Sequence, residues 1–421
     1  MTEQEAVAYI HSFGWEKHAP GLERIRALLS ILGDPQKALR FIHVAGTNGK
    51  GSVCAYLASV LKAAGYRVGL NTSPHLELFH ERIRVNGEMI PGGDLAVLTE
   101  RVRAAAEVLP EHPTEFELIT AVAFLYFRQE RCDVVVLETG LGGGLDASNV
   151  IDTPELAVLT AMGMDHAAIL GPTLRDIAAA KAGIIKPGGR VVSLGDCSEA
   201  DAVFRRTCRE RGAALTEVDL SRLGRVETSL RGTAFDFAPM RGLRIPLAGL
   251  YQSCNAAVAI TAVEVLRQGG WKISEGALRR GLEQVRWPGR FEVLCRKPPV
   301  ILDGAHNVQG VAAAVESLRV LFPGQKLVFL LGILADKETG AMLDLLAPLA
   351  DRVFALRPDS PRALEPEALC AMLAERGVPS QAMGSASEAV DAALAAAGET
   401  SAVCALGSLY LCGALRSLLP G

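Results

Sequence analysis

Residues 41–52 read FIHVAGTNGKGS, an apolar run followed by a glycine-rich loop, and this stretch decides the fold of the first half of the chain. Residues 41–45 predict a buried strand, and the apolar run 53–64 predicts a helix that begins directly after the loop. Such a loop binds phosphate, because backbone N–H groups and the helix dipole favour an anion and a lysine neutralises its charge. We therefore expect a nucleotide site on a parallel α/β sheet.

The spacing within the loop is unusual. Gly46 and Gly49 enclose only two residues where the common P-loop has four, and Gly51 separates Lys50 from Ser52. This contracted spacing restricts the candidate classes of nucleotide-binding enzyme more than an ordinary P-loop would.

Bulk properties exclude several other classes. A chain of 421 residues predicts two or three domains, and the net charge of −4 does not favour a nucleic-acid partner. The N-terminus lacks the basic and apolar blocks of a signal peptide, and no apolar run is long enough for a membrane span. The nine cysteines show no CxxC spacing, which is typical of reduced thiols. We expect a cytoplasmic protein with small-molecule substrates and with neither nucleic acid nor membrane as partner.

Apolar runs alternate with helical patterns along the chain, which favours an α/β fold of parallel sheets with crossover helices. The expected strands of the first half are residues 41–45, 67–70, 134–138, 156–160 and 190–193. A short Gly-punctuated β region follows over residues 220–245, and the segment 287–290 has the Pro and Gly of a linker. The alternation then restarts, with expected strands 300–303, 326–332, 352–356 and 402–407 and helices 308–321 and 408–418.

A carboxylate ends the expected strand 134–138. The glycine cluster 140–144 follows it, but Leu145 stands where a dinucleotide fingerprint needs its last glycine, so that interpretation is weak. Glu138 instead lies where such sheets bind ligands, and a carboxylate there suits Mg²⁺ against nucleotide phosphates. From local sequence alone, a solvated strand-end glutamate explains it equally well.

Other polar residues also admit a structural explanation. His166 follows a strand, although an isolated histidine is more often structural. Lys181 and Lys186 lie near a helix end, where cations complement the helix dipole. Asp303 ends a strand of the second half, and Asn307 is a good N-cap for the next helix.

Taken together, these motifs resemble the folylpolyglutamate synthase/dihydrofolate synthase family of the Mur-ligase-like superfamily, and they occur in the family's order over nearly the whole chain. The matching blocks are HVAGTNGKGS (43–52), TSPHL (72–76), ERIRVNG (81–87), LETGLGGGLDASNVID (137–152), MDHAAILGPTLRDIAAAKAGIIKPG (164–188), WPGRFEV (287–293), ILDGAHN (301–307), GILADKE (332–338) and GSLYLCGALR (407–416).

The resemblance implies an N-terminal, P-loop-containing Mur-ligase-like central domain with a parallel sheet and a smaller C-terminal Rossmann-like α/β domain. Residues 1–286 would bind ATP and the pterin or folate, residues 287–290 would form a hinge linker, and residues 291–421 would be the glutamate ligase domain. Domain closure would exclude water from the reacting groups.

The resemblance also assigns site residues. ATP would be bound by Thr47, Asn48, Gly49, Lys50, Gly51, Ser52, Asn255, Arg290, Asp303 and His306. Two Mg²⁺ ions would be held by Ser73, Glu138 and His166, and a monovalent cation is a further candidate cofactor. The pterin substrate would contact Thr114, Glu115, Phe116, Glu117, Leu145, Asp146 and Ala147. The catalytic set would be Lys50, Glu138, His166 and Lys181, the last as an N6-carboxylysine that supports a metal.

The implied reaction is ATP-dependent ligation of L-glutamate to dihydropteroate, to the γ-carboxylate of (tetrahydro)folates, or to both, through an acyl phosphate, by a monomeric enzyme. Two alternatives stay open: a related Mur-type amino-acid ligase acting on another carboxylate, and a P-loop ATPase or switch that ligates nothing.

The sequence departs from the family pattern at four positions. Gly144 replaces a common arginine, Ser148 a threonine, Tyr251 a frequent histidine and Ala180 a glutamate. The missing arginine bears on the choice of acceptor and leaves the ATP residues untouched.

Overall fold

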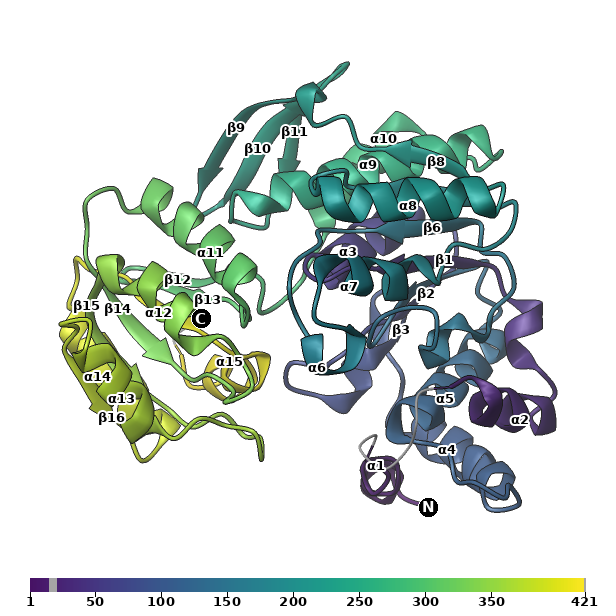
Figure 1. Ribbon diagram of the computed structural model, residues 1–421, viewed down its shortest axis with the longest axis horizontal. Coiled ribbons are helices and arrows are strands. Elements are labelled where there is room, and N and C mark those ends of the chain that lie inside the picture. Colours follow the sequence, from purple (N-terminus) through teal and green to yellow (C-terminus); the bar gives the residue numbers. More distant parts are fainter. Residues whose placement is uncertain (15–20, 420–421) are drawn as a thin grey trace. The chain divides into compact units, whose positions relative to one another are not determined.

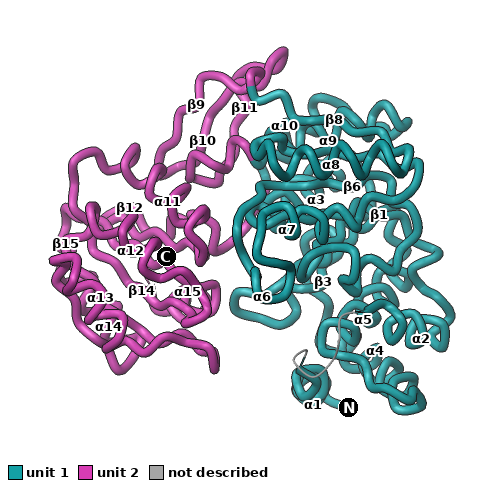
Figure 2. Tube along the Cα trace, in the orientation of Figure 1, with its two compact units in different colours: residues 1–220, 255–284 teal, residues 221–254, 285–421 magenta. Residues whose placement is uncertain are grey.

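The computed structural model describes residues 1–14 and 21–419, and the chain divides into two compact units, coloured separately in Figure 2. Unit 1 comprises Met1–Leu220 and Asn255–Gln284, and unit 2 comprises Ser221–Cys254 and Val285–Gly421. The chain therefore passes from unit 1 to unit 2, returns within one helix, and enters unit 2 again.

Unit 1 is built on an eight-stranded sheet of order β4-β3-β2-β5-β1-β6-β7-β8. Its strands are β1 (Phe41–Ala45), β2 (Val68–Asn71), β3 (Ile83–Val85), β4 (Glu88–Met89), β5 (Val134–Glu138), β6 (Leu156–Leu159), β7 (Arg190–Ser193) and β8 (Ala214–Glu217). The six strands from β2 to β8 in this order are parallel, and β3 and β4 add an antiparallel edge. All five residues of β1 and of β5 are buried, as expected for central strands covered on both faces.

Helices cover both faces of this sheet (Figure 1). They are α1 (Glu3–His11), α2 (Glu23–Ile31), α3 (Lys50–Ala63), α4 (Gly92–Ala106), α5 (Glu115–Gln129), α6 (Ala167–Leu170), α7 (Leu174–Ala182), α8 (Ser198–Glu210), α10 (Glu275–Gln284) and most of α9 (Tyr251–Gln268). Helix α5 is apolar on every side and is buried from Glu117 to Phe127. No helix among the described residues is both long and apolar enough to cross a bilayer.

Unit 2 has its own core and two sheets. The larger sheet has the order β12-β13-β17-β14-β15-β16 and is parallel except for β12. Its strands are β12 (Glu292–Arg296), β13 (Pro299–Leu302), β14 (Leu327–Leu331), β15 (Ala350–Ala355), β16 (Ser380–Ala382) and β17 (Val403–Leu406), with helices α11 (Val308–Leu321), α12 (Thr339–Leu346), α13 (Pro366–Ala374), α14 (Ala386–Ala397) and α15 (Leu409–Arg416). The smaller sheet is antiparallel: β9 (Leu223–Ser229), β10 (Gly232–Phe237) and β11 (Met240–Ile245).

The structure confirms the predicted α/β class and the expected parallel strands. The two compact units do not coincide with the predicted domains at residues 221–254, and the domain bounds stay a prediction. Residues 221–254 were expected in the first domain and belong to unit 2. The reason is packing: Ala248 lies in the apolar core of unit 2 with Ile301, and the backbone N–H of Leu250 donates to Ser317 Oγ at 3.0 Å. The ligand-binding roles assigned to the two domains stay predictions.

Candidate active site

The phosphate loop, residues 46–52, joins the central strand β1 to helix α3. Two of its glycines are required by close approach. A Cβ on Gly46 would lie 1.9 Å from Thr160 Oγ1, and a Cβ on Gly49, whose φ is +82°, would lie 2.5 Å from Asn255 Oδ1. The loop is therefore packed between the end of β6 and helix α9, and the predicted ATP residue Asn255 does lie beside it.

A second loop, after β6, fixes the shape of the phosphate loop. The carbonyl of Ala161 accepts the N–H groups of Thr47 and Asn48 at 2.9 and 3.1 Å, and Thr47 Oγ1 donates to the carbonyl of Gly163 at 3.0 Å. Thr160 Oγ1 donates to the carbonyl of Asn48 at 2.7 Å. The N–H groups of Thr47 and Asn48 are thus used within the protein, so the N-terminal turn of α3 is the part of the loop whose N–H groups and dipole could bind an anion.

Two lysines converge on one carbonyl of the loop. Lys50 Nζ lies 3.2 Å from the oxygen of Gly46 and 3.3 Å from that of Thr47, and Lys181 Nζ from helix α7 donates to the same Gly46 oxygen at 2.7 Å. Lys181 is only 5% exposed. Burial and then the charge of Lys50 lower the pKa of Lys181 to about 7. A solvated helix-end cation, the structural alternative for Lys181, does not fit this environment.

The predicted metal residues lie at the carboxyl ends of three strands of the unit 1 sheet: β2 and β5 are neighbours, and β1 lies between β5 and β6. Glu138 ends β5, is 5% exposed, and accepts the backbone N–H of Ser73 at 3.0 Å, just beyond β2. His166 lies beyond β6 in a left-handed conformation with φ +54°, and its N–H donates to Asp165 Oδ1 at 2.9 Å. The structure thus pairs Ser73 with Glu138. No group of three or more His, Cys, Asp or Glu is poised for a metal within residues 1–14 and 21–419.

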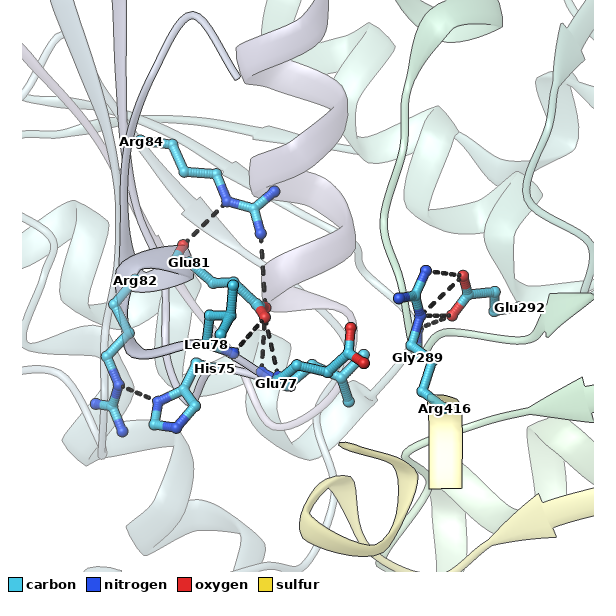
Figure 3. Close-up of polar contacts among 10 residues, drawn as sticks. His75, Glu77, Leu78, Glu81, Arg82, Arg84, Gly289, Glu292 and Arg416 are labelled. Carbon is cyan, nitrogen blue, oxygen red and sulfur yellow. Dashed lines mark hydrogen bonds and ion pairs between the residues drawn. The ribbon is translucent and has the colours of Figure 1, made fainter. Parts of the chain in front are cut away.

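The chain after Ser73 is wound around one carboxylate, as Figure 3 shows. Glu81 accepts the N–H groups of Leu76, Glu77 and Leu78 at 3.1, 2.9 and 2.8 Å and pairs with Arg84 at 3.5 Å. Burial raises the pKa of Glu81, but these donors outweigh it and leave the pKa below its ordinary value. The TSPHL and ERIRVNG blocks therefore form one ordered turn that holds Ser73 against Glu138.

The first predicted substrate segment lies beside the glycine cluster 140–144, which precedes the second. The ring of Phe116 covers Gly140, where an added Cβ would lie 2.7 Å from Phe116 Cζ. The flanking residues Thr114 and Glu117 form the capping box of α5, and Glu117 Oε2 also accepts from Arg24 at 3.1 Å. Glu117 Oε1 is buried and has no hydrogen-bond partner among the described residues, so a substrate role for Glu117 stays a prediction. Glu115 contacts His11 at 3.3 Å. Phe116 and Glu115 are thus the members of this segment with side chains outside the cap.

The loop that carries the second substrate segment is organised by a buried carboxylate. Asp146 accepts the N–H groups of Leu141 and Ser148 at 2.8 and 3.0 Å and the hydroxyl of Ser148 at 2.5 Å. Burial raises the pKa of Asp146 despite these donors. Leu145, by contrast, is 61% exposed, and Ala147 is buried. A direct substrate contact therefore suits Leu145 better than the carboxylate of Asp146.

Sequence reasoning missed His43, which ties this loop to the phosphate-loop strand. His43 Nε2 lies 2.8 Å from Ser148 Oγ, and because that hydroxyl donates to Asp146, the histidine must donate through Nε2. Nδ1 of His43 has no hydrogen-bond partner among the described residues. Burial lowers the pKa of His43 to about 3. The available signal was a lone polar residue inside a strand of apolar residues.

Ser148→Ala should therefore destabilise unit 1 by about 1–3 kcal/mol, because it leaves buried groups on both His43 and Asp146 short of a partner. Urea unfolding measures this loss. Ser148→Thr is the matched control, since it keeps the hydroxyl, and it should stay within about 1 kcal/mol of the wild type. Equal losses in both variants would show that packing, and not the hydroxyl, matters at this position.

The remaining predicted ATP residues lie close together within unit 2. Asp303 follows β13 and is 3% exposed, and His306 Nδ1 lies 2.8 Å from the carbonyl oxygen of Gly304. The guanidinium of Arg290 lies against Gly304, where an added Cβ would come within 2.7 Å of Arg290 Nη1. Glu292 anchors the same segment: it pairs with Arg416 at 2.9 Å and accepts the N–H of Gly289 at 2.9 Å (Figure 3).

Comparison with known proteins gives matches along the whole chain. The Mur ligase middle domain matches residues 44–263, and the Mur ligase, glutamate ligase domain matches residues 289–409. The chain is 40% identical over 433 residues to the folylpolyglutamate synthase of Lacticaseibacillus casei, covering 100% of this chain and 99% of that protein. It is 40% identical over 374 residues to the dihydrofolate synthase/folylpolyglutamate synthase of Bacillus subtilis, covering 86% of each. The structure of E. coli FolC in complex with DHPP and ADP matches with a TM-score of 0.88 and 30% identity, covering 99% of this chain and 97% of that one.

Proposed function

The chain belongs to the folylpolyglutamate synthase/dihydrofolate synthase family, and we propose that the residues gathered around Gly46 in unit 1 carry out its reaction. The protein is an ATP-dependent ligase that joins L-glutamate to folates or dihydropteroate. The observation that carries the site assignment is the convergence of Lys50 and Lys181 on the Gly46 carbonyl. A ligase for another carboxylate and a non-ligating switch are set aside, because the identity to folate ligases spans both Mur ligase domains.

The chemistry explains why ATP is needed. A carboxylate is a poor electrophile, since its leaving group would be oxide. An oxygen of the acceptor carboxylate therefore attacks the γ-phosphorus of ATP, the bond to ADP breaks, and an acyl phosphate forms. The amine of L-glutamate then forms the C–N bond, loses a proton and displaces phosphate. Charge stabilisation and exclusion of water are the main tasks left to the protein.

The phosphate loop supplies the charge stabilisation. We assign the ATP phosphates to residues 47–52, with Lys50 and the N-terminal turn of α3 facing the transferring group. Asn255 lies against Gly49 and would position the nucleotide from helix α9. In unit 2, Arg290 is the cation that suits a phosphate, and His306 is assigned to the nucleotide on the family resemblance.

Mg²⁺ fits the donors at the strand ends. The ion prefers oxygen ligands and keeps several waters, so one or two protein ligands suffice. We assign Ser73 and Glu138 to one ion and Glu138 and His166 to a second. Bound there, the ions would neutralise charge on the phosphates. The buried carboxylate of Glu138, 3.0 Å from the backbone nitrogen of Ser73, is the observation that supports this assignment.

Lys181 suits carboxylation by CO₂. Only the neutral amine adds to CO₂, forming an N–C bond with loss of a proton, and a pKa of about 7 leaves much of Lys181 neutral at physiological pH. The product is a carbamate, which replaces a buried cation by an anion beside the proposed metal residues.

The decisive experiment measures ADP release with ATP, Mg²⁺ and L-glutamate, comparing dihydropteroate with tetrahydrofolate as acceptor. Turnover that depends on L-glutamate and on one or both acceptors is expected, and the ratio of the two rates gives the preference. If neither acceptor stimulates turnover, the assignment fails.

Gly144→Arg should shift that preference without disturbing ATP. A Cβ at Gly144 would lie 3.4 Å from its nearest neighbour, Gly183 Cα, which is an ordinary van der Waals contact. An added cation favours the more anionic acceptor, and KM for tetrahydrofolate should fall about two- to fivefold relative to KM for dihydropteroate. Gly93→Arg, in open space on α4, is the matched control. A change in KM for ATP, or equal changes for both acceptors, would contradict this role.

A further inference from the structure

Arg290 lies in a backbone turn that is held from both sides within unit 2. Gly289 and Phe291 have φ values of +72° and +49°, so both flanking residues are left-handed, and Phe291 is a bulky aromatic in a conformation that L-residues rarely adopt. Such a conformation persists only where the surroundings hold it. The direction of the Arg290 side chain therefore depends on the contacts that fix this turn.

Two carboxylates fix it. Glu292 accepts the N–H of Gly289 at 2.9 Å and is held by Arg416. Asp303 Oδ2 accepts the N–H of Phe291 at 2.9 Å, and the N–H of Gly304 donates to the carbonyl of Gly289 at 2.9 Å. The left-handed Phe291 is thus secured through Asp303.

Tyr251, at the start of helix α9, completes this arrangement. Its hydroxyl donates to Asp303 Oδ2 at 2.5 Å, the same oxygen that accepts from Phe291, and its ring packs edge-on against Phe291 at 6.5 Å between centroids. Ala305 N–H donates to the other oxygen, Oδ1, at 2.7 Å. Three donors therefore orient a carboxylate that is 3% exposed, and Tyr251 is the side-chain donor among them.

Hydrogen bonds fix the backbone on either side of Arg290, but they do not fix its guanidinium. No hydrogen bond or ion pair joins it to any residue that the structure describes, and it lies over Gly304, where an added Cβ would come within 2.7 Å of Nη1. The side chain is half-buried. A cation whose backbone is fixed and whose donors are uncommitted is suited to an anionic ligand.

We propose that Tyr251 is a positioning residue for Arg290: by orienting Asp303 it secures the left-handed turn at Phe291 and directs the guanidinium toward a phosphate of the nucleotide. Asp303 then acts on Arg290 through the turn and also directly, as a nearby opposite charge. This inference rests on the ATP role proposed above for Arg290.

A double-mutant cycle tests the proposal. KM for ATP is measured by ADP release with a saturating acceptor, and the Kd of ADP is measured by titration calorimetry, for wild type, Tyr251→Phe, Arg290→Ala and the double variant. Tyr251→Phe removes only the hydroxyl and should raise both constants about five- to tenfold, with kcat changed less than twofold. Arg290→Ala should raise them further, and adding Tyr251→Phe to it should have no additional effect.

The controls separate the outcomes. Tyr410→Phe, a tyrosine 42% exposed on α15, should match the wild type. A normal KM for ATP in Tyr251→Phe beside a raised one in Arg290→Ala would overturn the proposal, as would a full Tyr251→Phe effect in the Arg290→Ala background. Unchanged ATP affinity in Arg290→Ala would overturn it together with the ATP role of Arg290. Failure of the proposed function would appear separately, as a wild type that releases no ADP with either acceptor.

Discussion

Lys50→Ala should lower kcat for ADP release about a thousandfold with either acceptor, because it removes the cation that we assign to the transferring phosphoryl group. In the structure Lys50 Nζ is folded over the loop, 3.2 Å from the Gly46 carbonyl oxygen, so its loss opens no core cavity. The variant should therefore fold, and circular dichroism with thermal unfolding checks this. Steady-state ADP release measures the effect.

The matched control for this prediction is Lys62→Ala, in the last turn of the same helix, where the side chain is exposed. It should retain the wild-type rate. Normal turnover in Lys50→Ala would contradict the role assigned to the phosphate loop, since Lys50 is the one charged residue of its sequence GTNGKGS (46–52).

Lys181→Met should abolish ligation and at the same time stabilise the fold near pH 7. The native pKa of about 7 lies below the ordinary lysine pKa of 10.5, so between these values the unfolded chain holds a proton that the folded chain lacks. Wild-type stability should therefore rise from pH 7 toward pH 10.5, by at most about 1.4 kcal/mol per pH unit, and the full cost of burying the charged lysine applies below pH 7. Methionine removes that cost and the slope with it.

Urea unfolding at pH 7 and pH 9 in CO₂-free buffer measures the slope, and ADP release with and without added bicarbonate measures ligation. Turnover of Lys181→Met should be reduced at least a hundredfold, and bicarbonate should not restore it. If Lys181 were only a helix-end cation, Lys181→Met would stay active and its free energy of unfolding would fall by a few tenths of a kcal/mol. An active variant, or one whose stability rises with pH like the wild type, contradicts a buried catalytic amine.

The parallel framework could be predicted from the sequence because its strands are continuous apolar runs. Residues 41–45 and 134–138 are buried throughout, as such runs require. The short antiparallel strands β3 and β4 were missed, because two or three residues carry too little pattern. The placement of residues 221–254 in unit 2 depends on tertiary contacts such as Leu250 with Ser317, which no local pattern encodes.

For the candidate site, the sequence could indicate candidate residues, but it could not predict the burial and hydrogen bonding of their side chains. Lys181 lies one helical turn after Ile177, which is fully buried, so both residues share one face of α7. The helical period therefore indicated that Lys181 is buried, whereas its position near the helix end suggested a solvated cation. Asp146 was expected at the substrate, yet both of its carboxylate oxygens accept hydrogen bonds within its own loop. Sequence spacing cannot reveal that a carboxylate is already satisfied.

His43 is fully buried in β1, the strand that leads into the phosphate loop, and its burial makes the stability of the fold sensitive to acid. Since its native pKa is about 3 and its ordinary value is 6.5, acidification through this interval favours proton uptake by the unfolded chain alone. Stability is therefore lost progressively as the pH falls from 6.5 toward 3, at the strand that leads into the phosphate loop. Around neutral pH the same group stays uncharged, so it adds no inflection of its own to the pH–rate profile of ligation.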